Sequence, residues 1–135
     1  MKKNVNIGSV AKFTFSDSDG NVVAYFRMNP ADVNVADRAG KVAAYFRDNA
    51  EKFSGNQGAD VLSQYDKELS EKMNYLLGYD ASVTLFGFMS PTSVLEDGKM
   101  FITVVMETIS ANIGDEIRKR YEKFAAVRKY TAKYE

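Results

Sequence analysis

The sequence contains no cysteine and no histidine among its 135 residues. Their absence excludes cysteine nucleophiles, disulfide bonds, zinc sites built from Cys and His, and catalytic triads or general bases that use histidine. A glycine-rich phosphate loop is also missing, because Gly55 and Gly58 lack the Gly-Lys-Ser/Thr that would follow. The sequence therefore predicts a protein that is not an enzyme and carries no cofactor.

Long apolar runs are absent as well. No stretch of about 18 apolar residues is present to span a bilayer. Residues 1–6 carry charge but no apolar run follows them, unlike a secretory signal peptide. We therefore expect a soluble cytoplasmic protein with no membrane partner, a setting in which a lack of cysteine has no cost.

The remaining composition is typical of one folded domain. Hydrophobic residues make up 45% of the chain, which includes nine Phe and eight Tyr. Because domains usually have about 100–200 residues, the length predicts a single domain over residues 1–135.

Charge is balanced overall but uneven along the chain. Eighteen Lys and Arg match eighteen Asp and Glu, so the molecule has no net charge that would attract nucleic acid. The basic C-terminal tail, residues 118–135, holds seven basic residues against Glu122 and the final Glu135. Its aromatic residues could stack on single-stranded nucleic acid, but a solvated helix end or a protein partner explains the same composition and is favoured.

A β-hairpin is predicted near the start of the chain. Apolar residues alternate along 10–15 and return after a turn-rich gap, which indicates two strands within about 8–28. The gap contains Asp17, Asp19 and Asn21, whose alternate spacing is also that of the start of a calcium loop. The later glycine and glutamate of such a loop are missing, so a hairpin turn is favoured and no metal site is predicted.

Two amphipathic helices are predicted next. Asn29 and Pro30 match an N-cap and a first helical residue, and they begin a helix expected over about 30–53. Asp60 is placed to cap a second helix over about 60–77. Apolar residues recur at steps of three and four in both, which is typical of an antiparallel pair that buries one stripe of each helix.

The last third of the sequence predicts one long helix. Short helical turns are expected between residues 80 and 91. An apolar ladder from Phe101 to Tyr121 then predicts a helix over about 99–130, in which Gly114 marks a bend or a close helix contact. The predicted fold class is α+β, predominantly helical, with the N-terminal hairpin packed on the antiparallel helix pair plus the long C-terminal helix.

Pairs of acidic residues are the remaining candidates for catalysis, because two carboxylates can share acid and base roles. Each pair has a simpler interpretation as part of ion pairs spaced four residues apart on a helix. We therefore predict no catalytic residues. The predicted ion pairs are Glu68 with Lys72, Asp115 with Lys119, and Glu116 with Arg120.

Several short motifs follow the hairpin in a definite order, together with a helix that carries Arg38. They are Phe26-Arg27-Met28-Asn29-Pro30-Ala31-Asp32, Tyr75-Leu76-Leu77-Gly78, Leu85-Phe86-Gly87, Asp97-Gly98 and Arg128-Lys129-Tyr130-Thr131-Ala132-Lys133-Tyr134. Over most of the chain, this arrangement resembles the small tail assembly chaperones of long-tailed bacteriophages and prophages of Gram-positive bacteria. The resemblance implies a non-enzymatic protein of the host bacterial cytoplasm. Its partner would be the long, hydrophobic tape measure protein, which it would coat until the tail tube polymerises.

Apolar and aromatic residues supply the candidate partner-binding sites, because a chaperone for a helical client needs an adaptable apolar surface. Methionine suits such a surface, although methionines also fill cores. The predicted partner-binding residues are Phe86, Phe88, Met89 and Met100, and, along the tail, Tyr121, Phe124 and Tyr130.

Two other functions stay open. A nucleic-acid-binding accessory protein would use residues 118–134, and its binding would fall steeply with salt. A structural component of the phage tail would remain in purified particles, whereas a chaperone would be absent from them. A homo-oligomer formed through the long helix is also possible, because a helical stripe can be buried within one chain or between two.

Overall fold

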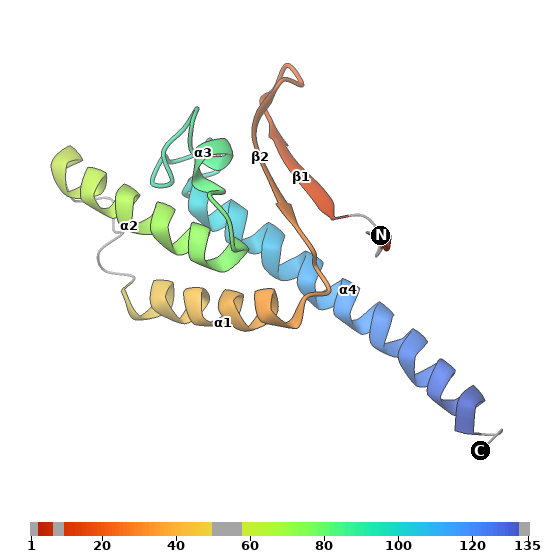
Figure 1. Cartoon of the computed structure of the whole chain (residues 1–135). Helices are drawn as coiled ribbons and strands as arrows, with labels where there is room; N and C mark the ends of the chain where they lie inside the picture. Colours follow the sequence, from red (N-terminus) through yellow and green to blue (C-terminus); the bar gives the residue numbers. More distant parts are fainter. Residues whose placement is uncertain (1–2, 7–9, 50–57, 133–135) are drawn as a thin grey trace.

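The computed structural model describes residues 3–6, 10–49 and 58–132, except for the side chains of 59, 121 and 127–132. The fold is α+β and mostly helical, as predicted, with a hairpin, an antiparallel helix pair and a long C-terminal helix (Figure 1). The elements in chain order are β1 (Ala11–Ser16), β2 (Val22–Met28), α1 (Val33–Asp48), α2 (Ala59–Leu77), α3 (Ser82–Leu85) and α4 (Phe101–Ala132).

The hairpin pairs β1 and β2 antiparallel, with Phe13 opposite Phe26 and a shift in register after Phe15. In the turn, the Asp17 carboxylate accepts hydrogen bonds from the backbone N–H groups of Asp19 and Asn21, both at 2.9 Å. These bonds, above all the one from Asn21, lower the pKa of Asp17. The carboxylate therefore holds the turn closed. The predicted hairpin start near residue 8 lies outside the described residues.

The first helix begins later than the sequence predicts. Asp32 is its N-cap, and the Asp32 carboxylate accepts a hydrogen bond from the Asn34 N–H at 2.9 Å. Asn29 instead closes a turn, in which its carbonyl oxygen accepts from the Asp32 N–H at 3.1 Å. Asn29 and Pro30 therefore do not begin the helix. Both Asn29 and Asp32 are good capping residues, and the sequence alone did not rank them.

The connection between α1 and α2 also departs from the prediction. The first helix ends at Asp48 with Asn49 as its C-cap, and the predicted end near residue 53 lies outside the described residues. The N-cap of α2 is Gly58 rather than Asp60. Asp60 lies in the first turn instead, where its negative charge still favours the positive end of the helix dipole.

The second helix ends where the sequence predicts. Gly78 is its C-cap and adopts the left-handed conformation with φ +82°, which costs other residues about 1–2 kcal/mol. Arg38 of α1 donates from Nε to the carbonyl oxygen of Leu76 at 3.0 Å. This cation at the C-terminal end of α2 satisfies one of its last carbonyls and joins the two antiparallel helices.

Residues 80–91 contain less helix than predicted. Only α3 forms there, and Ser90-Pro91 begins a turn in which the Ser93 N–H donates to the Ser90 carbonyl oxygen at 3.1 Å. The chain then doubles back through Gly98, at φ +86°, with Val94 and Met100 forming an isolated bridge. The Ser90-Pro91 pair, which predicts the start of a helix, is therefore followed by one short turn and then by this reversal of the chain.

The long helix contributes its first half to the core. Phe101, Val105, Ile109 and Ile113 are buried, as the ladder predicts. Gly114 makes no close helix contact, since a Cβ atom there would meet no neighbouring atom within 4 Å. The C-terminal part of α4 extends away from the other elements (Figure 1).

One core joins the hairpin to the helices. The Phe15 and Phe101 rings meet edge to face with centroids 5.4 Å apart, which connects β1 to α4. Phe26 of β2 is fully buried in the same cluster as Val42 of α1 and Leu76 of α2. In the described part of the chain, no helix has both the length and the apolar character needed to cross a membrane.

The predicted ion pairs are formed in one case of three. Glu116 and Arg120 pair at 3.0 Å, whereas Asp115 pairs with Arg118 at 3.6 Å. Glu68 and Lys72 do not pair with each other; both contact Tyr45 of α1 instead. Tyr45 of α1 donates its hydroxyl to Glu68 of α2, and Lys72 lies over the Tyr45 ring, 4.4 Å from its centroid.

Candidate functional site

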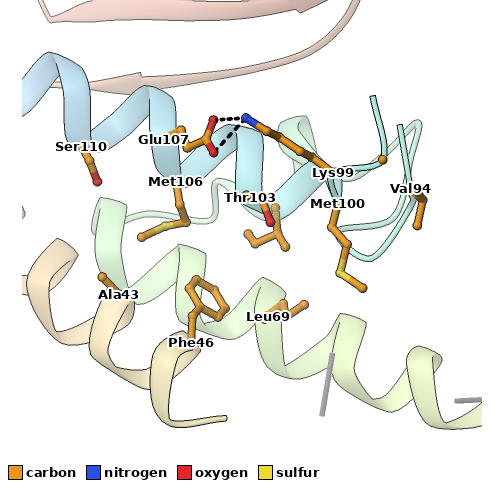
Figure 2. A pocket seen from close by; sticks show the side chains of 12 residues that line it. Ala43, Phe46, Leu69, Val94, Lys99, Met100, Thr103, Met106, Glu107 and Ser110 are labelled. Carbon is orange, nitrogen blue, oxygen red and sulfur yellow. Dashed lines mark hydrogen bonds and ion pairs between the residues drawn. The ribbon is translucent and has the colours of Figure 1, made fainter. Parts of the chain in front are cut away.

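An open groove lies between α1, α2 and the first half of α4 (Figure 2). Its volume is about 750 Å³, and most of its exposed lining is apolar. We call it the α1–α4 groove. Its lining residues are Ala43, Phe46, Leu69, Val94, Gly98, Lys99, Met100, Ile102, Thr103, Met106, Glu107 and Ser110.

Helical spacing brings the lining residues of α4 to one face. Met100 lies just before the helix, and Thr103 and Met106 follow at intervals of three residues, which places them on neighbouring turns of one side. Figure 2 shows these side chains on the α4 side of the groove, with Phe46 of α1 and Leu69 of α2 opposite them. The groove is therefore walled by helices on both sides, and its floor is apolar.

The two charged residues that line the groove neutralise each other. Lys99 Nζ lies 3.1 and 3.2 Å from the two carboxylate oxygens of Glu107, and both side chains are about half exposed. The pair stands at the edge of the groove in Figure 2. Among the described lining residues, the charges therefore occur as one ion pair beside a mainly apolar surface.

The loop that carries Val94 is fastened to α2. Thr92 is buried, and both its backbone N–H and its hydroxyl donate to one carboxylate oxygen of Asp66, at 3.1 and 2.7 Å. This double hydrogen bond holds the loop against α2 without regular secondary structure. As a result, Val94 stands 65% exposed at the wall of the groove.

The described side chains were also searched for groups that could hold a metal ion. No group of three or more His, Cys, Asp or Glu residues that could hold a metal ion occurs in residues 3–6, 10–49 and 58–132. The described lining of the groove includes Lys99, Thr103, Glu107 and Ser110, of which Lys99 and Glu107 form an ion pair.

The structure separates the first four predicted partner-binding residues. Only Met100 lines the groove. Phe86 and Met89 pack against the core, with the Phe86 ring 5.9 Å from that of Phe101 and perpendicular to it. Phe88 is 75% exposed and follows α3, outside the groove lining.

The predicted residues of the tail lie elsewhere. Phe124 is 56% exposed and borders a second hollow of about 400 Å³. The side chains of Tyr121 and Tyr130 lie outside the described residues. The second hollow, formed where the start of α1 approaches α4, is lined by Ala31, Val33, Ile117, Arg120 and Phe124.

Several groove residues were missed at the level of sequence. Phe46 and Leu69 belong to the predicted apolar stripes, so the pattern assigned them to the core rather than to a surface. Met106 lies beside the ladder of α4, and although its methionine character was noted, it was not included among the predicted partner-binding residues. The six methionines were a usable signal, because two of them, Met100 and Met106, line the groove.

No family model, curated protein or solved structure matches this chain. The α1–α4 groove is therefore interpreted from its own shape and chemistry.

Proposed function

We propose that this protein is a tail assembly chaperone of a long-tailed phage or prophage. In this proposal it acts in the host bacterial cytoplasm, has no catalytic activity, and binds amphipathic helices of the tape measure protein until the tail tube forms. The observation that carries the proposal is the apolar α1–α4 groove. It supports the proposal independently of the resemblance in the order of the sequence motifs.

A helix is the ligand that best suits this groove. An amphipathic helix presents apolar side chains every three or four residues, and a groove between two helices accepts it as a further member of a bundle. Phe46 offers an aromatic surface, while Met100 and Met106 have flexible thioether side chains that adapt to different neighbours. Such adaptability is useful for a client that presents many similar but non-identical helical segments.

The experiment is co-expression of the full chain with the tape measure protein, followed by measurement of the soluble fraction and of co-purification. We expect the partner to be insoluble alone and soluble in the complex. The complex should resist high salt, since apolar burial is screened much less than charge pairing.

Two variants test whether the groove is the binding site. Ala43→Glu and Thr103→Glu each place a charge at an exposed position of the lining, so the fold should be retained. Both should reduce co-purification at least tenfold, because a buried unpaired charge opposes apolar binding. Ser63→Glu is the matched control, since it adds the same charge at an exposed position of α2 outside the groove.

The same preparation separates the alternatives. If the groove variants bind the tape measure protein as well as the Ser63→Glu control does, the groove is not its site. Retention of the protein in purified particles would favour a structural tail component. Binding to a single-stranded oligonucleotide that weakens steeply with salt would favour the nucleic-acid reading of residues 118–134.

A further inference from the structure

The two edges of the hairpin differ in their partners. On the outer edge of β2, the Arg27 N–H donates to the Tyr79 hydroxyl at 2.7 Å. The Thr84 hydroxyl donates to the carbonyl oxygen of Tyr25, also at 2.7 Å. Side chains from the segment that includes α3 therefore close this edge.

Within the described residues, the outer edge of β1 has no backbone partner. The backbone groups of Tyr25 and Arg27 that make the contacts at the β2 edge point away from β1. Tyr25 lies opposite Thr14 and Arg27 lies opposite Lys12. These two pairs are therefore the ones without hydrogen bonds between the strands. In an antiparallel ladder such residues direct their own N–H and C=O groups outward. No backbone group in the described part of the chain pairs with Lys12 or Thr14 on this side.

The usual protection of an exposed edge is weak here. A lysine often blocks edge pairing with its charge, but the Lys12 ammonium lies over the Tyr25 ring, 4.5 Å from its centroid. The register shift, which could twist the edge away, comes only at Phe15 and Ser16, the far end of the strand. The middle of β1 therefore remains able to accept another strand.

The distribution of charge along the hairpin favours a second copy of the same hairpin, in the antiparallel direction, as the strand that pairs with β1. The exposed turn carries Asp17 and Asp19, whereas the opposite end of the hairpin carries exposed Lys12 and Arg27. When two hairpins pair antiparallel through β1, the acidic turn of each lies near the basic end of the other. Parallel pairing would place like charges together, which is unfavourable.

We propose that two copies of this chain pair antiparallel through the outer edges of β1 and form one continuous four-stranded sheet. The pairing satisfies the backbone groups of Lys12 and Thr14 on both copies. It also extends a two-stranded sheet, which is marginal in isolation, to a more stable size. No residue of β1 lines the α1–α4 groove, so this interface is independent of the proposed client site.

Sedimentation of the full chain over a concentration series tests the proposal, and we expect a monomer–dimer equilibrium. Thr14→Pro should shift the chain to monomer, since proline removes the outward N–H at an edge position without removing a bond to β2. Thr14→Val is the matched control, because it keeps the N–H and suits a strand, and it should dimerise like the wild type.

Amide hydrogen exchange provides a readout that does not depend on the variants folding. In the wild type, protection of the Lys12 and Thr14 amides should rise with protein concentration. The Phe13 and Phe15 amides, which face β2, should be protected throughout.

Either of two results would overturn the proposal. One is a wild-type chain that stays monomeric at high concentration with unprotected Lys12 and Thr14 amides. The other is a Thr14→Pro variant that keeps its hairpin by circular dichroism and still dimerises as the wild type does. Asp19→Lys adds a test of direction. The Asp17 carboxylate, and not the Asp19 side chain, accepts the hydrogen bonds of the turn, so the turn should be kept while the charge reversal weakens the dimer roughly two- to tenfold.

Discussion

At the residue scale, Tyr45 shows how one polar contact joins two helices. Its ring contacts Phe46, with centroids 5.7 Å apart, and carries the Lys72 ammonium on its face. Its hydroxyl donates to Glu68 of α2. These contacts lie next to Phe46 in the chain, so they help to orient one wall of the α1–α4 groove.

Stability at alkaline pH should depend on Tyr45. Burial, together with the hydrogen bond to Glu68, raises the pKa of the Tyr45 hydroxyl well above its ordinary value of about 10. The unfolded chain therefore loses this proton at lower pH than the folded chain, and the contribution of Tyr45 to stability falls as the pH rises above about 10.

Urea unfolding of the wild type and of Tyr45→Phe at several pH values from 8 to 11 checks this prediction. The free-energy advantage of the wild type over Tyr45→Phe should shrink with rising pH, because phenylalanine has no proton to lose. Two curves that stay parallel across this range would contradict the assignment.

At the element scale, the helix ends were the least predictable feature, because several local signals compete within a few residues. Asn29 and Asp32 are both residues that favour the N-cap position, and Asp32 takes it. Gly58 and Asp60 are both suitable for the start of α2, and Gly58 is its N-cap. Gly78 was predictable, since a glycine directly after an apolar stripe is the usual residue for a left-handed C-cap.

Two glycines of the helical region should respond in opposite ways to alanine. Gly78→Ala should lower the free energy of unfolding by about 1–2 kcal/mol, because φ is +82° there and alanine is strained in that conformation. Gly40→Ala should raise it by about 0.5–1 kcal/mol, because Gly40 lies inside α1 and a Cβ atom would meet nothing within 4 Å. Thermal or urea unfolding of both variants measures the difference, and equal effects would show that the left-handed cap has no special role.

At the scale of the whole molecule, the two halves of α4 lie in different environments, the first in the core and the described part of the second in solvent. The core cluster includes its residues up to Ile113, with Ile117 packed against that cluster. The described side chains from Arg118 onward are exposed. The first half of the helix therefore supports the fold, while the second half extends beyond it and carries much of the basic tail (Figure 1).

A chain that ends at Phe124 should retain the fold. Its free energy of unfolding should stay within about 0.5 kcal/mol of the full chain, because the described core lies entirely before this residue. Urea unfolding of the two chains, followed by circular dichroism, makes the comparison. A loss of several kcal/mol would place part of the core beyond Phe124.

The candidate site was predicted only in part, and particular residues show why. Methionine and aromatic content indicated an adaptable surface, and Met100 lines the groove. Phe86 was placed in the binding set by the same reasoning, yet its ring packs perpendicular to that of Phe101. Local sequence distinguishes apolar from polar residues, but it does not say which apolar residues another element covers.

The sequence by itself determined the order and type of the main elements, because alternation and helical periodicity are properties of neighbouring residues. The strands of the hairpin, the two stripes of the helix pair and the ladder of α4 all follow from such local patterns. Tertiary structure alone decided that Val42 is fully covered while Phe46, one turn later, lines a groove. The reason is that exposure along one stripe depends on where α4 crosses α1, and that crossing is set by contacts between residues far apart in the chain.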